Sequence, residues 1–357
     1  LRVNTVDWIS LVLVIVGAIN WGLVGIGQFL EANWNLVNLV FGSVPTLEYL
    51  VYVLVGLAGV YESALSTARR DSLDDYSRFR VAAAAFVGCN PDEVVPAAGV
   101  VQALRLAVGV TVSPGDSVAL PAPCCGEYAR EIRLQGGEPV HVPHDSLLER
   151  VDPAEHATVI LGYPANPLGT AYPRDELRAF IDSCRRADTP VIVDETYLGF
   201  TRLPSTAGLD GVIALHSVTN VFGVPSLRAG FAAATGDLGD RLSRARCSWA
   251  LSSPAVEVAT FCLEQDDFLE ATRDRVERER PRILAELDRL GYDPHPADGA
   301  LVLFRAADVD RVLRETRRRG FVVRDARDYQ RLDSHVRINV RRPNENDSLL
   351  DALAEAT

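Results

Sequence analysis

Charged residues are distributed very unevenly along this chain, and that distribution sets the strongest limit on how it can fold. Residues 8–30 contain no Asp, Glu, Lys or Arg. A helix of that length rises roughly 34 Å, enough to cross a hydrocarbon core of about 30 Å. A second apolar run, residues 49–61, covers only about 20 Å if helical, and would reach across by including residues 44–47 and burying or snorkelling Glu48. We therefore expect residues 8–61 to form a two-helix membrane hairpin.

Two alternatives exist for this segment. A secretory signal peptide would need a basic start and a small-x-small cleavage site, but only Arg2 precedes the apolar run and a second apolar run follows. A soluble protein with a buried helical hairpin is the other alternative. Residues 33–42 alternate amide and apolar side chains, which suits an interfacial turn with Trp34 at headgroup level. Arg69 and Arg70 follow the second run and favour a cytoplasmic C-terminal module.

From residue 62 onward, short runs rich in β-branched residues alternate with amphipathic stretches. The runs predict buried parallel strands at residues 117–120, 158–161, 191–193 and 212–215. The stretches between them predict helices over residues 100–108, 127–134 and 174–186. This alternation indicates an α/β sheet covered on both faces. A long polar helix over residues 267–290 then leads to a smaller α+β unit, with strands near residues 301–304, 321–323 and 336–340. The expected domains are residues 1–61, 62–265 and 266–357.

Composition excludes some function classes. A net charge of −12 argues against a nucleic-acid partner, because phosphates require a basic protein surface. The six cysteines form no CxxC pair, so we expect reduced thiols. His141 and His144 have no third ligand nearby and are expected in a solvated strand end or loop. We therefore expect no metal. All 36 residues in the Lys+Arg count are arginine, so the chain has no lysine.

One segment carries a specific motif. Residues 217–230 read Ser-Val-Thr-Asn-Val-Phe-Gly-Val-Pro-Ser-Leu-Arg-Ala-Gly. This resembles the cofactor-lysine signature of the fold-type-I pyridoxal-phosphate enzymes, the aminotransferase class I and II superfamily: Ser/Thr-x-Ser/Thr-Lys-x-Phe-Gly-x-x-Gly-x-Arg-x-Gly. Asn220 occupies the position of the lysine that forms the Schiff base. The resemblance extends from about Tyr61 to the end of the chain. It implies a large, mostly parallel α/β domain followed by a small α+β domain.

The same resemblance assigns residues around the pyridine ring of pyridoxal 5′-phosphate. Asn166, in Pro-Ala-Asn-Pro-Leu-Gly, and Tyr197 would hydrogen-bond O3′ of the cofactor. Asp194, in Asp-Glu-Thr-Tyr, would keep the ring nitrogen protonated and make the ring an electron sink. Taken alone, the first motif is an ordinary turn and Asp194 an ordinary residue at a strand end. Their spacing relative to Arg228 favours the site.

Five further positions match family residues that bind the cofactor phosphate. Ser217, Thr219 and Arg228 would bind the cofactor phosphate, and Gly99 and Val100 would offer backbone N–H groups at a helix start.

Two arginines match family positions that bind the substrate. Arg337 resembles the arginine that clamps a substrate carboxylate, and Arg324 lies at another substrate position. Within the superfamily, the chain is most similar to threonine-phosphate decarboxylase and next to histidinol-phosphate aminotransferase. This implies a lyase or transferase that acts on a phosphorylated amino acid such as threonine phosphate. It also implies a homodimer with the site at the subunit interface.

The first sixty residues resemble a different family. The block Asn-Trp-Gly-Leu-Val-Gly at residues 20–25, with residues 52–61, resembles a small two-span membrane family of unknown function. The resemblance covers residues 6–61 and implies a helical hairpin with both ends on one side.

Four features depart from the aminotransferase pattern. Asn220 replaces the lysine, Cys125 replaces an aromatic residue that stacks on the ring, and Asp71 replaces a tyrosine that reaches the partner subunit's phosphate. The membrane hairpin occupies the place of the N-terminal arm. We therefore expect pyridoxal phosphate to bind non-covalently and catalysis to be impaired. The alternatives are a membrane-anchored protein that binds a ligand or partner without catalysis, and a fused enzyme remnant.

Overall fold

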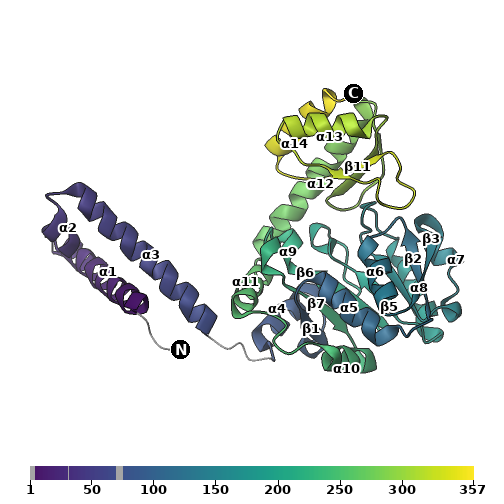
Figure 1. Ribbon diagram of the computed structural model, residues 1–357, viewed down its shortest axis with the longest axis horizontal. Helices are drawn as coiled ribbons and strands as arrows, with labels where there is room; N and C mark the ends of the chain where they lie inside the picture. Colours follow the sequence, from purple (N-terminus) through teal and green to yellow (C-terminus); the bar gives the residue numbers. More distant parts are fainter. Residues whose placement is uncertain (1–4, 31, 70–74) are drawn as a thin grey trace. The chain divides into compact units, whose positions relative to one another are not determined.

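The computed structural model describes residues 5–30, 32–69 and 75–357. The chain forms two compact units, Leu1–Ser72 and Leu73–Thr357, each described here by itself (Figure 1). Asp71, one of the four departures from the family pattern, lies outside the described residues.

The described residues of the first unit form the helices α1 (Thr5–Phe29), α2 (Leu36–Phe41) and α3 (Pro45–Arg69). Helices α1 and α3 contact each other, and the absence of a side chain at Gly17 lets Val55 approach closely. Among the described residues, only the stretch Trp8–Phe29 is long and apolar enough to cross a membrane; the apolar part of α3, Pro45–Tyr61, is shorter. Helix α2 lies within residues 33–42, which the sequence predicts as an amide-rich turn.

Several described polar side chains of this unit are hydrogen-bonded to one another or to the backbone at the turn. Asn20 accepts a hydrogen bond from the N–H of Val37 at 3.1 Å, which ties α1 to the start of α2. Asn38 and Tyr52 donate to the Glu48 carboxylate at 3.0 and 3.3 Å. Because buried polar groups are costly unless they are hydrogen-bonded, this network lets α3 carry an acid near its start.

The second unit begins with a seven-stranded sheet in the order β1-β7-β6-β5-β4-β2-β3. Strands β2 to β6 pair in parallel, whereas β7 runs antiparallel between β1 and β6. The sheet is thus mostly parallel, and the four predicted strands are confirmed as β2, β4, β5 and β6. The strand bounds are β1 (Val94–Ala97), β2 (Ser117–Ala122), β3 (Glu138–Pro143), β4 (Thr158–Gly162), β5 (Val191–Asp194), β6 (Val212–Ser217) and β7 (Gly230–Ala234).

Helices cover both faces of this sheet. Alternate strand residues such as Leu120 and Ile192 pack with α5 (Val100–Thr111), α6 (Gly126–Leu134) and α10 (Gly236–Ala245). Their sequence neighbours, such as Ala119 and Val193, pack on the opposite side with α7 (Leu147–Arg150) and α8 (Arg174–Arg186). This follows from the two-residue period of strands. Helices α4 (Ser77–Val87) and α11 (Ser253–Leu263) cover the β1–β7 end.

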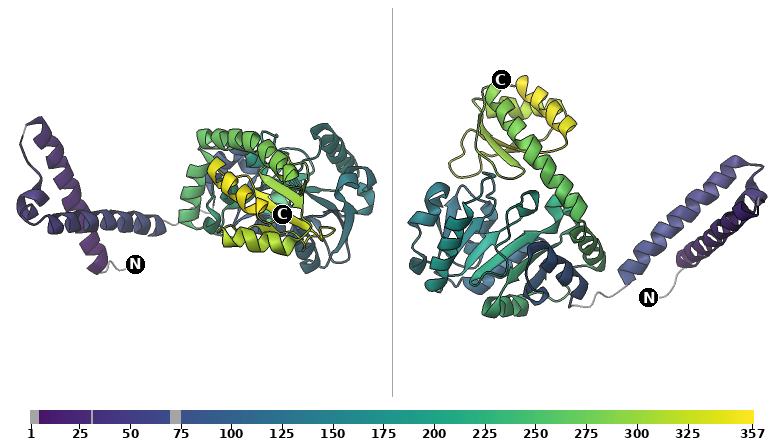
Figure 2. Two further views of the ribbon diagram at one scale, coloured as in Figure 1. Left: turned by 90° about the horizontal axis from the view of Figure 1, so that it is seen from above. Right: turned by 180° about the vertical axis from the view of Figure 1, so that it is seen from behind.

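The helix α12 (Asp266–Arg289) leads to a smaller sheet, which forms a separate lobe of this unit in Figure 2. Its order is β10-β11-β9-β8. The core of the lobe lies between this sheet and α12, α13 and α14. The bounds are β8 (Asp293–Pro294), β9 (Leu301–Arg305), α13 (Val309–Arg318), β10 (Arg324–Asp325), β11 (His335–Asn339) and α14 (Pro343–Ala354). The predicted helices are confirmed as α5, α6, α8 and α12.

Two local predictions are wrong. The segment 321–323 is not a strand, and the edge strand β10 begins after it, at Arg324. The Phe321 N–H donates instead to the carbonyl of Thr316 at 2.9 Å, at the end of α13, and Val322 is 83% exposed. His144 is buried instead of solvated, because its Nδ1 lies 3.0 Å from the Tyr172 hydroxyl and its ring stacks on the tyrosine.

Candidate functional site

The candidate site lies at the carboxyl ends of β5 and β6, where open α/β sheets place their ligands. These strands are parallel neighbours, and Asp194 at the end of β5 is in register with Leu215 of β6. Ser217 ends β6 two residues later, and Thr219 and Asn220 follow in the short helix α9 (Val218–Val221). The predicted ring-nitrogen and phosphate groups therefore occupy one edge of the sheet.

Asp194 is held by two side chains that sequence motifs did not assign. Tyr128 donates its hydroxyl to Oδ2 at 2.7 Å. Thr196 donates both its backbone N–H (3.0 Å) and its hydroxyl (2.5 Å) to Oδ1. Burial, with Asp194 nearby, raises the pKa of Tyr128 well above its usual value, so its hydroxyl stays a donor. The two carboxylate oxygens are therefore fixed in orientation. In the sequence, Tyr128 lies three residues after Cys125, the position where the family pattern has a stacking aromatic residue.

The residues predicted to hold a phosphate converge around Gly230. This glycine is in register with Ser217 on one side and Ala97 on the other. A Cβ added at Gly230 would lie 2.6 Å from the carbonyl oxygen of His216 and 3.1 Å from the backbone nitrogen of Val100. The start of α5 therefore lies directly against the end of β6. The Gly99 N–H donates to the carbonyl of Ala97 at 2.8 Å, so of the two predicted backbone donors the Val100 N–H is the one left for an anion.

The side chains of Ser217, Thr219 and Arg228 complete this anion-binding group, which we call the phosphate cradle. The Ser217 Oγ lies 3.0 Å from the Thr219 Oγ1. Gly99 has φ +87°, and a Cβ there would come within 2.7 Å of the Arg228 guanidinium, so the arginine lies across the helix start. Arg228 itself takes the left-handed conformation with φ 50° and also donates to the carbonyl of Pro225. Two hydroxyls, a guanidinium and a helix start are the groups that bind a phosphate dianion.

Asn166 and the small domain meet at one hydrogen-bonded group. Arg337 donates from its Nη1 to the side-chain oxygen of Asn166, and Tyr329 donates to the same oxygen at 3.3 Å. The Arg337 Nη1 also lies 3.3 Å from the Tyr329 hydroxyl. Among the described residues, the buried Nε of Arg337 has no partner. Tyr329 is a further residue that the sequence motifs did not indicate.

Arg324 lies next to Arg337 across the small sheet. The two are register partners on β10 and β11, so their side chains share one face. Arg324 lies over the Tyr329 ring at 5.4 Å from the centroid and pairs with Asp328. A groove of about 480 Å³ contains both arginines together with Arg341. Arg341 pairs with Glu345 at 3.0 Å, and Glu345 also lines the groove, so part of the positive charge is balanced there.

Tyr197 and Cys125 lie close to the same charged groups. Burial raises the pKa of the Tyr197 hydroxyl, Arg337 opposes that shift, and Asp194 adds to it. Burial and then Asp194 raise the pKa of the Cys125 thiol to about 11. The thiol is therefore protonated at neutral pH and is not a nucleophile there. Its small side chain takes the position where the family pattern has an aromatic ring.

Asn220 is exposed, and the Thr219 hydroxyl donates to its Oδ1 at 3.3 Å. It thus continues the polar row that starts at Ser217. The row ends in a carboxamide, which cannot form a Schiff base.

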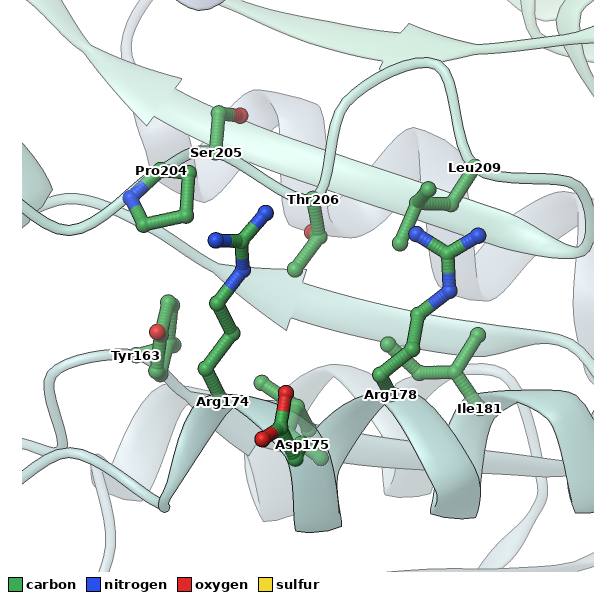
Figure 3. A pocket seen from close by; sticks show the side chains of 10 residues that line it. Tyr163, Arg174, Asp175, Arg178, Ile181, Pro204, Ser205, Thr206 and Leu209 are labelled. Carbon is green, nitrogen blue, oxygen red and sulfur yellow. The ribbon is translucent and has the colours of Figure 1, made fainter.

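Another cavity, of about 180 Å³, lies between the start of α8 and the loop at residues 204–209 (Figure 3). Arg174 and Arg178 point from α8 toward that loop. None of the predicted site residues line it. For metals, no group of three His, Cys, Asp or Glu side chains gathers anywhere in residues 5–30, 32–69 and 75–357.

Comparisons with known proteins agree with this geometry. The sequence matches the family "Aminotransferase class I and II" over residues 68–355 and "Domain of unknown function (DUF378)" over residues 4–66. A Caldanaerobacter subterraneus protein, whose name provisionally assigns it threonine-phosphate decarboxylase activity, is 25% identical over 299 residues, covering 78% of this chain and 80% of its own length. A histidinol-phosphate aminotransferase of Halobacterium salinarum is 30% identical over 287 residues, covering 74% and 76%.

A solved structure shows the same fold. The L-threonine-O-3-phosphate decarboxylase of Porphyromonas gingivalis superposes with a TM-score of 0.74 at 23% identity, covering 82% of this chain and 91% of that one. Both predicted family resemblances are confirmed. Because one family match spans most of its length, the chain belongs to the aminotransferase class I and II family, whose members use pyridoxal phosphate.

Proposed function

We propose that residues 73–357 form a pyridoxal-phosphate-type site that binds its cofactor without a covalent link and takes a phosphorylated amino acid such as threonine phosphate. By descent, the site is that of a decarboxylase or aminotransferase. Turnover is lost or strongly reduced because Asn220 stands at the lysine position. The membrane-anchored binding protein without catalysis is the limiting case of the same proposal.

The observation that carries this proposal is the cradle around Gly230. Gly99 leaves space for the Arg228 guanidinium, and Gly230 lets the start of α5 reach Ser217. Side chains at either glycine would close this space. A cradle of hydroxyls, backbone N–H groups and one guanidinium fits a phosphate ester.

The residues expected around the pyridine ring also fit the cofactor. Tyr128 and Thr196 orient the Asp194 carboxylate, which would hold the protonated ring nitrogen. The side-chain oxygen of Asn166 is occupied by Arg337 and Tyr329, so its NH₂ group is left to donate to O3′. When bound, the cofactor supplies an electron sink for a carbanion at the substrate Cα. Losing the residue that serves as nucleophile and proton carrier costs typically 10²-fold or more.

We further propose that Arg337 and Arg324 bind the anionic groups of the substrate. Their shared face of the small sheet and the adjoining groove support this assignment. The resemblance to dimeric enzymes supports a homodimer as the functional assembly. The apolar stretch Trp8–Phe29 supports anchoring through residues 8–61. We propose that the shorter apolar part of α3 forms a second span, and the two arginines that follow it in the sequence, Arg69 and Arg70, favour a cytoplasmic C-terminal module.

The test is a titration of the purified full chain, in detergent, with pyridoxal 5′-phosphate, followed by its absorbance. The wild type should bind the cofactor reversibly and lose it on desalting. Arg228→Ala should weaken binding at least tenfold, whereas Arg244→Ala, which changes an exposed arginine on α10, should leave it unchanged. Asn220→Lys should retain the cofactor through desalting and, after borohydride reduction, carry its mass on residue 220. Failure of both the wild type and Asn220→Lys to bind would overturn the proposal.

Turnover is tested on the same proteins. Threonine phosphate and histidinol phosphate are incubated with wild type and Asn220→Lys in the presence of the cofactor. We expect product only from the lysine variant. Turnover by the wild type within tenfold of the variant would show that the site does not need a lysine.

A further inference from the structure

We propose that the cavity between the start of α8 and the loop at residues 204–209 binds a small monocarboxylate with a short apolar body (Figure 3). The volume of this cavity is about 180 Å³. A cavity of about 150 Å³ holds benzene, so the ligand is limited to about the size of one ring or one branched side chain. None of the residues assigned to the cofactor or the substrate line the cavity, so this second site does not depend on the proposed function.

Two guanidiniums are the groups that point to an anion. Arg174 and Arg178 are exposed, lie one helical turn apart on α8, and extend across the cavity toward the loop (Figure 3). Within the part of the chain that the structure describes, neither has a hydrogen-bonded or ion-paired partner. At the other end of the same helix, by contrast, Arg185 lies 3.9 Å from the Asp182 carboxylate. The planar fork of N–H groups on a guanidinium matches the two oxygens of a carboxylate.

The hydroxyl of Tyr163 adds a third donor. This residue is 1% exposed and lines the cavity, and among the described residues its hydroxyl has no hydrogen-bond partner. Burial and then Glu195 raise the pKa of Tyr163, and Arg174 opposes that shift, so the hydroxyl is protonated at neutral pH. A buried hydroxyl without a partner costs free energy, and a ligand oxygen in the cavity would remove that cost.

The loop side of the cavity contributes no free hydroxyl donor. The hydroxyls of Ser205 and Thr206 donate to the buried Glu195 carboxylate at 2.5 and 2.7 Å, so their protons are already used. The side chains of the described lining that can still donate are therefore the two guanidiniums and the Tyr163 hydroxyl. Such a set of donors suits the oxygen atoms of an anion.

The charges of the lining favour a single negative charge on the ligand. Asp175 also lines the cavity, so together with Arg174 and Arg178 the lining carries one net positive charge. A phosphate dianion would be repelled by Asp175 and by the buried Glu195 behind the loop, whereas a monocarboxylate balances the lining. If the ligand is an amino acid, its ammonium has Asp175 as an available partner.

The remaining lining is apolar and sets the character of the ligand body. Leu177 and Ile181 are 2% and 3% exposed, and Pro204 and Leu209 face them from the loop. An aliphatic group of the size of a leucine side chain would contact these residues, and its removal from water favours binding. Charged groups at the entrance of an apolar cavity are the usual arrangement in small-molecule sites.

Isothermal titration calorimetry of the full chain in detergent with isocaproate, the leucine skeleton without its amine, tests the proposal. We expect one saturable site per chain with a Kd on the order of 0.1 mM. Isocaproamide, which is uncharged, and inorganic phosphate should each bind at least tenfold more weakly. Arg174→Ala and Arg178→Ala should each weaken isocaproate binding at least fivefold, and Tyr163→Phe about threefold. Arg186→Ala, which changes an exposed arginine of the same helix outside the cavity, should leave binding unchanged.

A further variant separates this cavity from the proposed substrate groove. We expect Arg337→Ala to leave isocaproate binding unchanged. Weaker binding in Arg337→Ala with no effect of Arg174→Ala would place the carboxylate in the substrate groove and overturn the proposal. The absence of saturable isocaproate binding, or tighter binding of phosphate, would overturn it as well. Failure of the cofactor titration would leave this result untouched, since the two sites share no residue.

A parallel titration with leucine identifies the source of the carboxylate. Tighter binding of leucine than of isocaproate, with the difference lost in Asp175→Asn, assigns the cavity to an apolar amino acid. Tighter binding of isocaproate assigns it to a carboxylic acid without an amine. Both results support a monocarboxylate site, provided that Arg174→Ala weakens the binding.

Discussion

At the scale of single residues, the site depends on how the Asp194 carboxylate is held. Tyr128→Phe removes one of its three donors without changing the buried ring. Hydrogen bonds to charged groups contribute about 1.5–3 kcal/mol, so we expect the free energy of unfolding in urea to fall by about 1.5–2 kcal/mol. Affinity for the cofactor should fall too, because Asp194 is less firmly oriented. Tyr163→Phe is the matched control, since within the described ranges the hydroxyl of this buried tyrosine has no hydrogen-bond partner. Equal effects of the two variants would contradict the role of Tyr128.

Glu131 makes a pH-dependent contribution to stability outside the site. Its carboxylate is 2% exposed and lies 2.9 Å from the Arg105 Nε and 2.6 Å from the Arg130 Nη1. The hydrogen bond from Arg105 is the largest cause that lowers the pKa of Glu131 below its ordinary value of 4.5. Because the folded-state pKa is the lower one, the stabilisation is complete above the unfolded pKa and is lost as pH falls through the folded value.

Glu131→Gln tests this contribution. At pH 7 we expect the variant to be about 1–2 kcal/mol less stable than the wild type, with the difference shrinking below about pH 4.5. Urea unfolding between pH 4 and 8 measures it. Glu127→Gln, which removes a half-exposed partner of the same Arg130 at 3.4 Å, should cost less than about 0.5 kcal/mol at any pH. A pH-independent difference for Glu131→Gln would show that packing, not charge, is what the glutamate provides.

At the scale of elements, the close contact between β6, β7 and the start of α5 sets the shape of the phosphate cradle. Gly230→Ala would place a methyl group 2.6 Å from a backbone carbonyl, which cannot yield as a flexible side chain would. We expect a loss of about 2–3 kcal/mol in unfolding free energy, and cofactor binding weakened more than tenfold. Gly109→Ala in α5 has open space around it and should stabilise the protein by about 0.5–1 kcal/mol. Unchanged binding in Gly230→Ala would mean that α5 does not contribute to the cradle.

The sequence pattern correctly predicted the strands and helices whose apolar residues recur at a regular spacing. The buried runs of β2, β4, β5 and β6 appear where predicted, and so does the amphipathic α8, which has acids in its first turn and arginines in its last. The antiparallel strand β7 was not predicted, because residues 230–234 consist of glycine, phenylalanine and alanine and lack β-branched residues. The segment 321–323 shows the opposite error. Its composition suits a strand, but whether a segment joins a sheet depends on a neighbour that sequence does not reveal.

At the scale of the whole molecule, the spacing of the family motifs predicted where the site lies, but not the hydrogen bonds and the strand register that shape it. Asp194, Ser217 and Arg228 come from three elements that the topology brings to one sheet edge, and the family pattern gives their spacing. Tyr128 and Thr196 donate to Asp194, and Tyr329 donates to Asn166, but a tyrosine or threonine in a sequence carries no sign of its partner. Register between β7 and its neighbours, which makes Gly230 critical, is likewise a property of the folded chain.

The first unit gives the molecule an apolar surface that its second unit lacks. Of the 32 exposed large hydrophobic residues in the described ranges, 24 lie in residues 6–60, and an apolar surface of this kind marks contact with a membrane or another protein. We expect the full chain to stay with membranes after carbonate extraction. Val16→Asp combined with Ile19→Asp, two exposed α1 positions, adds about 3 kcal/mol per charge to insertion and should release the protein.

The matched control for this experiment is Val81→Asp combined with Leu134→Asp, which places the same charges at exposed apolar positions of the second unit. It should remain in the membrane fraction, because these positions do not enter the bilayer. Release of both double variants would point to general destabilisation, and retention of both would show that α1 does not anchor the chain. If only the α1 variant is released and its cofactor binding is unchanged, the pyridoxal-phosphate-type site works independently of its membrane attachment. That separation is what two compact units with independent family matches predict.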